Sequence, residues 1–148
     1  MTVTALTATP VAQIKGRGNF RLLLKQAQAQ QVSLHQEMEA LIERSKVRGS
    51  PLYLQRHTKP NETWMLRWRM VEGGKHHHVL WPELQPLLES LPIAIRKHCD
   101  EINQRATELN TLDIILEHTA KWCGILLEGG SARKGKRMEK KPPGYYET

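Results

Sequence analysis

The stretch WMLRWRMVEGGKHHHVLW, residues 64–81, decides the fold that the sequence predicts. Successive residues of a β-strand point to opposite faces, and the residues here alternate in type with that period of two. One face carries Trp64, Leu66, Trp68 and Met70, and the other carries Met65, Arg67, Arg69 and Val71. Gly73-Gly74 is a two-residue hairpin signal, so we expect the chain to return as a further strand over residues 75–81.

The period of two begins earlier, at residue 52, where Leu52 and Leu54 alternate with a tyrosine and a glutamine. The KPNE segment that follows is a turn signal between this strand and the tryptophan-rich one. The pattern therefore predicts a three-stranded antiparallel meander between residues 51 and 81. A small sheet packs one face on the core, and the tryptophans are the natural buried set. Arg67 and Arg69 then point outward.

Helical periodicity lies on both sides of this sheet in the sequence. A first helix is predicted over residues 19–47, with Asn19 as its N-cap, and a short helix over residues 82–91 opens at Pro82. A long helix is predicted from about residue 93 to 128. The apolar stripe of the first helix comprises Phe20, Leu24, Ala27, Gln31, Leu34, Met38 and Leu41. The heptad seam of the long helix comprises Ile95, Cys99, Ile102, Ala106, Leu109, Leu116, Ala120, Cys123 and Leu127.

One polar residue, Asp113, interrupts that seam. We expect it either to pair with a basic group or to fix the register of the helix. The predicted fold class is α+β and mostly helical, with two long antiparallel helices flanking the three-stranded antiparallel β-meander. The predicted organisation is a flexible N-terminal arm over residues 1–15, one domain over 16–128, and a disordered basic C-terminal tail over 129–148.

The composition points to a basic protein with a lean core. The 148 residues are 39% apolar and 5% aromatic, which favours long helices packed side by side, and the formal charge is +7. Such an excess is typical of proteins with a polyanionic partner, although a basic protein without such a partner fits equally well. Cys99 and Cys123 have no CxxC partner, no apolar run is long enough for a membrane helix, and the N-terminus lacks a signal-peptide pattern. We therefore expect a cytoplasmic protein with reduced thiols that does not bind a membrane.

The outward strand face is the first candidate site for nucleic acid. Two arginines two residues apart on a strand lie about 7 Å from each other, close to the spacing of successive phosphates. Arginine also makes planar, two-pronged contacts with phosphate or guanine. Third-strand residues would extend the site, so its predicted members are Arg67, Arg69, Lys75, His76 and His78. The alternative is a solvated basic face whose arginines pair with carboxylates of the helices.

The second candidate site is the basic tail. Six basic residues in nine positions are typical of segments that bind phosphates without reading sequence, and a purely solubilising tail is the alternative. These residues are Arg133, Lys134, Lys136, Arg137, Lys140 and Lys141. The sequence shows no phosphate loop, metalloprotease motif or nucleophile elbow, so we expect no enzyme activity and no cofactor. Only His76 and His78 of the histidine run could share an ion, and no metal site is expected.

Three short motifs resemble a family of small proteins carried by bacterial integrating conjugative elements. They are LRWR at Leu66–Arg69, VLWPEL at Val79–Leu84 and ELNTLDIILEHT at Glu108–Thr119, and IKGRGNF at Ile14–Phe20 resembles the start of that family's first helix. The chain differs by having KPNETWM where the family has a Gly/Thr-rich run. The resemblance implies a role in maintaining the DNA of a mobile element and adds no catalytic residue. The meander with its GG turn is also similar in architecture to the arm-type DNA-binding domains of tyrosine recombinases.

Two hypotheses follow. The first is a non-catalytic accessory or regulatory protein of a mobile genetic element that binds nucleic acid, with DNA favoured over RNA. The second is a helical interaction or scaffold subunit that uses the long-helix seam to form a homodimer or to bind a protein partner. An open arginine face would favour the first hypothesis, and a covered arginine face beside an exposed apolar helix stripe would favour the second.

Overall fold

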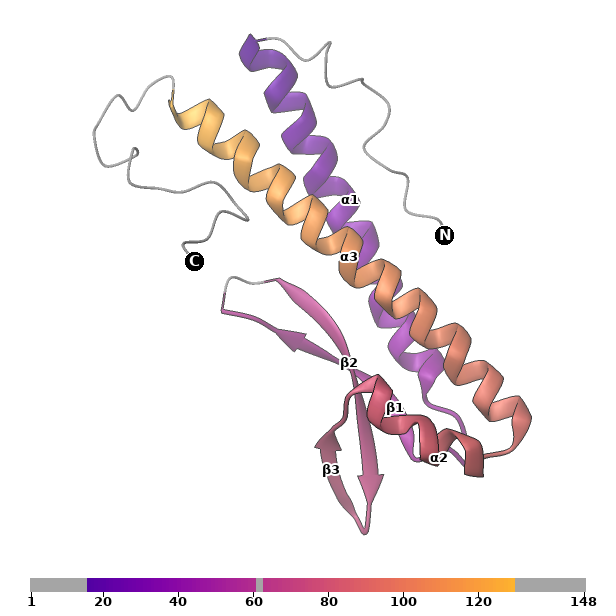
Figure 1. Ribbon diagram of the computed structural model, residues 1–148. Helices are drawn as coiled ribbons and strands as arrows, with labels where there is room; N and C mark the ends of the chain where they lie inside the picture. Colours follow the sequence, from indigo (N-terminus) through magenta and orange to yellow (C-terminus); the bar gives the residue numbers. More distant parts are fainter. Residues whose placement is uncertain (1–15, 61–62, 130–148) are drawn as a thin grey trace. The chain divides into compact units, whose positions relative to one another are not determined.

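The computed structural model describes residues 16–60 and 63–129. In chain order the elements are α1 (Gly16–Ser45), β1 (Leu52–Thr58), β2 (Trp64–Glu72), β3 (Lys75–His78), the 3-10 helix η2 (Trp81–Leu84), α2 (Gln85–Ser90) and α3 (Ile93–Gly129) (Figure 1). The predicted α+β fold, with long helices beside a three-stranded antiparallel sheet, is confirmed. The predicted arm over 1–15 lies outside the described residues, as does the tail apart from Gly129.

The described chain divides into two compact units. The sheet unit is residues 34–113, and the helical unit consists of residues 16–33 and 114–129. Each long helix contributes one segment to each unit. The predicted single domain over 16–128 stays a prediction.

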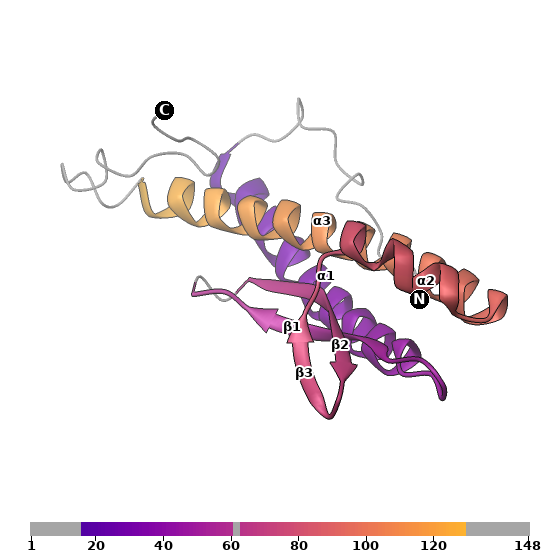
Figure 2. The same cartoon turned by 60° about the horizontal axis from the view of Figure 1, so that its bottom comes forward.

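The sheet has the strand order β1-β2-β3, with both neighbouring pairs antiparallel. Gly73 and Gly74 have φ angles of 57° and 78°, which is the left-handed pair that a two-residue hairpin requires. Glu72 pairs with Lys75 across this turn. Within the sheet unit, the β2–β3 hairpin extends away from that unit's segments of α1 and α3 (Figures 1 and 2).

The third strand is shorter than predicted, because it ends at His78 rather than at residue 81. After His78 only one further ladder-like bond forms, from the Val79 N–H to the Trp68 carbonyl, at 3.1 Å. The chain then turns into η2, where Pro82 occupies the first turn, a position that suits proline in a helix. A proline has no N–H to donate to a ladder, so the strand pattern ends before it.

The tryptophan face of the sheet is buried at Leu66 and Trp68, as predicted, whereas Trp64 and Met70 are only half-buried. Leu66 and Trp68 of β2 are 4% and 5% exposed, and they lie beside the buried Leu52 and Leu54 of β1. The helix segments of the sheet unit also contribute buried apolar residues: Leu34, Met38, Leu41, Ile42, Cys99, Ile102, Ala106 and Leu109. Most of these belong to the predicted stripe and seam, so much of the seam is used inside the protein.

The first helix begins at Gly16 and ends at Ser45, rather than spanning residues 19–47, so Asn19 lies inside the helix and is not its cap. At the other end, Ser45 Oγ donates a hydrogen bond to the Ile42 carbonyl and accepts one from the Leu54 N–H, at 2.6 and 2.8 Å. This buried hydroxyl therefore ties the end of α1 to the start of the sheet.

The helical unit is an antiparallel pair of helix segments. Gln31 donates a hydrogen bond to Glu117, and Arg17 donates one to the Leu127 carbonyl, so the chain directions oppose each other. Ala27, Leu116 and Cys123 are its buried apolar residues. Burial raises the pKa of the Cys123 thiol, as it does for Cys99 in the sheet unit, and both cysteines are free. Within the described residues no helix has the length and hydropathy needed to cross a membrane.

Candidate nucleic-acid interface

The outer face of the sheet is open along all three strands. We define this outer face by the strand register, and each of its residues is half-buried or exposed. It comprises Tyr53, Gln55, His57, Met65, Arg67, Arg69, Val71, His76 and His78. This set contains two arginines and three histidines and no carboxylate, so every ionisable group with a charge near neutral pH is a cation.

Neither arginine of the outer face has a carboxylate partner among the described residues. The Arg67 side chain makes no hydrogen bond or ion pair with the described residues. Arg69 donates one hydrogen bond, from Nη2 to the His76 carbonyl at 3.1 Å, and its Nε is shielded from solvent without an acceptor. The alternative in which helix carboxylates neutralise these arginines therefore does not describe the structure.

Other basic side chains of the sheet unit do pair with helix carboxylates. Arg105 donates hydrogen bonds to Glu37 at 2.7 Å and to Glu108 at 2.8 Å, and these bonds raise the pKa of its guanidinium. Arg56 contacts Glu39 at 3.2 Å. Glu37, Glu39 and Glu108 are thus engaged away from the outer face, and no carboxylate of the described residues compensates the charge of Arg67 and Arg69.

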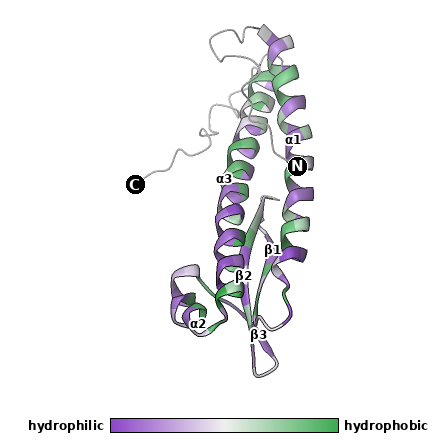
Figure 3. Cartoon of the chain, turned by 90° about the vertical axis from the view of Figure 1, so that its right-hand side faces the viewer, coloured by the Kyte–Doolittle hydropathy of each residue, from purple (hydrophilic) through white to green (hydrophobic). Residues whose placement is uncertain are grey.

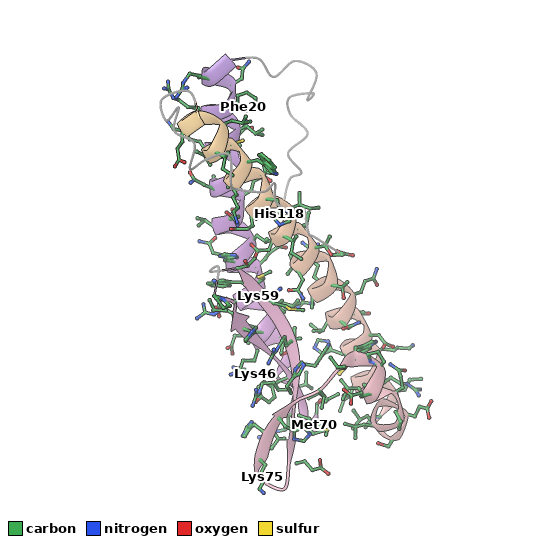
Figure 4. All side chains as sticks on the ribbon, turned by 60° about the vertical axis from the view of Figure 1, so that its left-hand side comes forward. Phe20, Lys46, Lys59, Met70, Lys75 and His118 are labelled. Carbon is green, nitrogen blue, oxygen red and sulfur yellow. The ribbon has the colours of Figure 1, made fainter. Side chains whose placement is uncertain are left out.

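The third strand adds two of its three predicted residues to this face. His76 is paired through Nδ1 with the Tyr53 hydroxyl at 2.7 Å, and His78 Nδ1 lies 3.3 Å from the Trp68 carbonyl. Lys75 lies at the tip of the hairpin (Figure 4), where its pairing with Glu72 places it on the opposite side from Arg67 and Arg69. The predicted basic group is therefore split by the strand register, with Lys75 apart.

Side chains of α3 satisfy the edge of β2 that β3 does not reach. Asn110 accepts a hydrogen bond from the Leu66 N–H at 2.8 Å and donates one to the Leu66 carbonyl at 3.1 Å. Asp113 accepts from the Trp64 N–H at 3.1 Å. An unpaired strand edge attracts other strands, and these two residues cap it where β3 does not extend. They also fix how β2, and hence Arg67, is positioned.

Asp113 is fully buried and pairs with a basic group, which is one of the two alternatives that the sequence predicted. His35 Nε2 lies 2.8 Å from its Oδ1. The His35 ring stacks on Trp64 with 4.0 Å between centroids, and the Arg56 guanidinium lies 4.1 Å from the centre of the Trp64 ring. Sequence reasoning missed His35, because its role depends on a contact with a residue 78 positions away.

The tail residues predicted to bind phosphate, 133–141, lie outside the described residues. Within residues 16–60 and 63–129 no group of three or more His, Cys, Asp or Glu side chains could hold a metal ion. No protein-family model, no curated protein and no solved structure matches this chain.

Proposed function

We propose that the protein is a non-catalytic nucleic-acid-binding protein whose structured contact surface is the outer face of the sheet. One observation carries this proposal: among the described residues, no carboxylate lies on the outer face or pairs with the side chain of Arg67 or Arg69. Uncompensated guanidinium groups on a rigid strand bind phosphates and release the counterions that surround a nucleic acid. The basic tail adds contacts that do not depend on sequence.

The resemblance to proteins of integrating conjugative elements makes DNA the proposed polymer and maintenance or regulation of a mobile element the proposed role. His76 and His78 lie on the same face as the two arginines and extend it toward the hairpin.

Binding of labelled single-stranded and duplex oligonucleotides over a series of salt concentrations tests this proposal. Replacing Arg67 and Arg69 together with alanine is expected to weaken binding by at least about tenfold and to reduce any preference between strand types. Deleting residues 131–148 is expected to weaken binding to all sequences alike. On duplex DNA the logarithm of the binding constant falls linearly with the logarithm of the salt concentration. The steepness of this slope should decrease by up to about 0.9 for each phosphate that the shortened protein no longer neutralises.

A matched control removes the same charge elsewhere in the sheet unit. Arg48 and Lys97 are exposed and lie outside the outer face, so their joint replacement with alanine should cost much less affinity than the strand pair. Equal losses for both double variants would reduce the effect to net charge and contradict a defined face. The absence of any binding by the full chain at about 50 mM salt would end the proposal. Binding lost only with the tail would leave the sheet as a scaffold.

A second candidate function, self-association, rests on the helical unit. Phe20, Leu23, Trp122 and Leu126 line an apolar groove of about 400 Å³ together with Ile115, His118, Thr119 and Cys123. Ile115 and Leu126 are 50% and 48% exposed, and Figure 3 shows hydrophobic residues along this part of α3. Two helix segments have a single shared core, and a second copy packed groove to groove would give a four-helix arrangement that covers both grooves.

Leu126→Glu is expected to convert a dimer into a monomer in light scattering coupled to size exclusion at about 100 µM, because it places a charge inside the groove. Lys121→Glu is the control, since Lys121 is exposed on the same segment and does not line the groove. A monomeric wild-type protein at that concentration would remove this candidate.

A further inference from the structure

A pocket of about 310 Å³ opens in the sheet unit, beside β2, where the short third strand stops. Its base is the β2 segment from Met65 to Trp68, one wall is the chain from His78 to Trp81, and the other wall is α3 around Asn103 and Thr107. Figure 2 shows the chain leaving the end of β3 toward α2 and α3. A third strand that ran to residue 81 would have filled this space.

The pocket combines an aromatic platform with polar groups. Trp81 lies against Trp68 with 5.4 Å between ring centroids, and it is half-buried while Trp68 is buried. Because Trp68 Nε1 donates to Asn103 Oδ1 at 2.9 Å, the Asn103 amide is oriented and its nitrogen supplies two N–H donors. Met65 and Leu80 contribute exposed apolar surface at the rim. Such a lining fits a flat heteroaromatic ring with polar edges.

Arg67 connects the pocket to the outer face, since it belongs to both. It has no acceptor among the described residues, so its guanidinium can bind an anion at the pocket rim. An aromatic slot with a cationic rim matches one nucleotide, with the base in the slot and its phosphate on Arg67. The volume is at the lower end for ligand sites, which suits one base and excludes a base pair.

We infer that this pocket takes one unpaired nucleobase of a single-stranded nucleic acid while the phosphate of that nucleotide binds Arg67. The inference rests on the proposed function and specifies the strand type. In a duplex the bases are stacked and paired, so only an unpaired or flipped base reaches such a pocket. Stacking on an aromatic side chain tolerates any base, so the pocket adds affinity for single strands without a sequence preference.

Thr107→Trp tests the inference, because Thr107 is an exposed residue of α3 that lines the pocket and a large side chain there fills it. Thr111→Trp is the matched control, one turn further along the same exposed helix surface and outside the lining. Melting curves confirm that both variants fold. Fluorescence anisotropy then measures their binding to a labelled oligothymidine, to a duplex of the same length, and to thymidine monophosphate as a competitor.

The expected result is that Thr107→Trp weakens oligothymidine binding by at least about fivefold, the lower end for losing one stacked base, and leaves duplex binding unchanged. Thr111→Trp should change neither. Unchanged single-strand binding by Thr107→Trp overturns the pocket inference, while the proposed function survives if Arg67 and Arg69 still matter for binding. Thymidine monophosphate that competes as strongly as the oligonucleotide assigns the pocket to free nucleotides and overturns the strand assignment. Wild-type protein that binds no nucleic acid overturns the proposed function itself.

Discussion

Replacing Asp113 with alanine is expected to lower the free energy of unfolding by about 2–4 kcal/mol. The carboxylate is fully buried, and it is the acceptor for the Trp64 N–H as well as the partner of His35. Alanine leaves the Trp64 N–H unpaired at the edge of β2, and it removes the group that holds the His35 ring. The His35 side chain is 23% exposed, so water can replace part of its lost partner, which keeps the loss below that of a fully buried ion pair.

Asp113→Asn is the matched variant, because asparagine has nearly the same shape and keeps one oxygen that can accept the Trp64 N–H. The asparagine variant should lose less than half of the unfolding free energy that the alanine variant loses. Urea unfolding followed by circular dichroism measures both values. Alanine and asparagine variants that unfold alike, with losses under about 1 kcal/mol, would show that the carboxylate does not support the strand edge.

The sequence predicts the sheet well, because its signals are local. The period of two in β2 and the Gly73-Gly74 pair need only neighbouring residues, and the observed left-handed glycines and pairing match them. The choice of the buried face also follows from local chemistry, since one face of β2 carries tryptophans and the other carries arginines. Counting alternate residues across the two-residue turn places Lys75 on the same face as Met70. The sequence therefore already contained the information that Lys75 lies on the opposite face from Arg67 and Arg69.

What the sequence does not predict depends on contacts between distant segments. Asn110 and Asn103 look like ordinary polar positions on a helix, and their roles appear only when α3 lies along the edge of β2. The length of β3 is a similar case. Val79 and Leu80 continue a strand-like pattern, but further along the same edge of β2 the backbone groups of Leu66 and Trp64 are already bonded to α3 side chains. The pocket beside β2 follows from that competition.

The functional site divides in the same way. Arg67 and Arg69 could be assigned to an outward face from their spacing alone, but their lack of carboxylate partners required the positions of Glu37, Glu39 and Glu108. Local pattern therefore predicts where the cations point. Only the packed helices show that no carboxylate of the described residues compensates their charge.

The largest expected loss of stability is for Trp68→Ala, at about 3–5 kcal/mol, the range for removing a large buried side chain. Trp68 is 5% exposed, packs against Trp81, and donates its indole N–H to Asn103. Alanine opens a cavity under the sheet and leaves the Asn103 oxygen without its donor. In a domain of this size such a loss is a large part of the total stability, so the melting temperature should fall by well over ten degrees.

Trp68→Phe separates the two contributions, because phenylalanine keeps most of the ring packing and loses only the indole N–H and some volume. It should cost about 1–2 kcal/mol, mostly from the unpaired Asn103 oxygen. Differential scanning calorimetry of the three proteins provides the comparison. If Trp68→Ala left the melting temperature unchanged, the tryptophan face would be exposed and the arginine face buried. Arg67 and Arg69 could not then contact a nucleic acid, so this stability measurement also tests the orientation on which the proposed function depends.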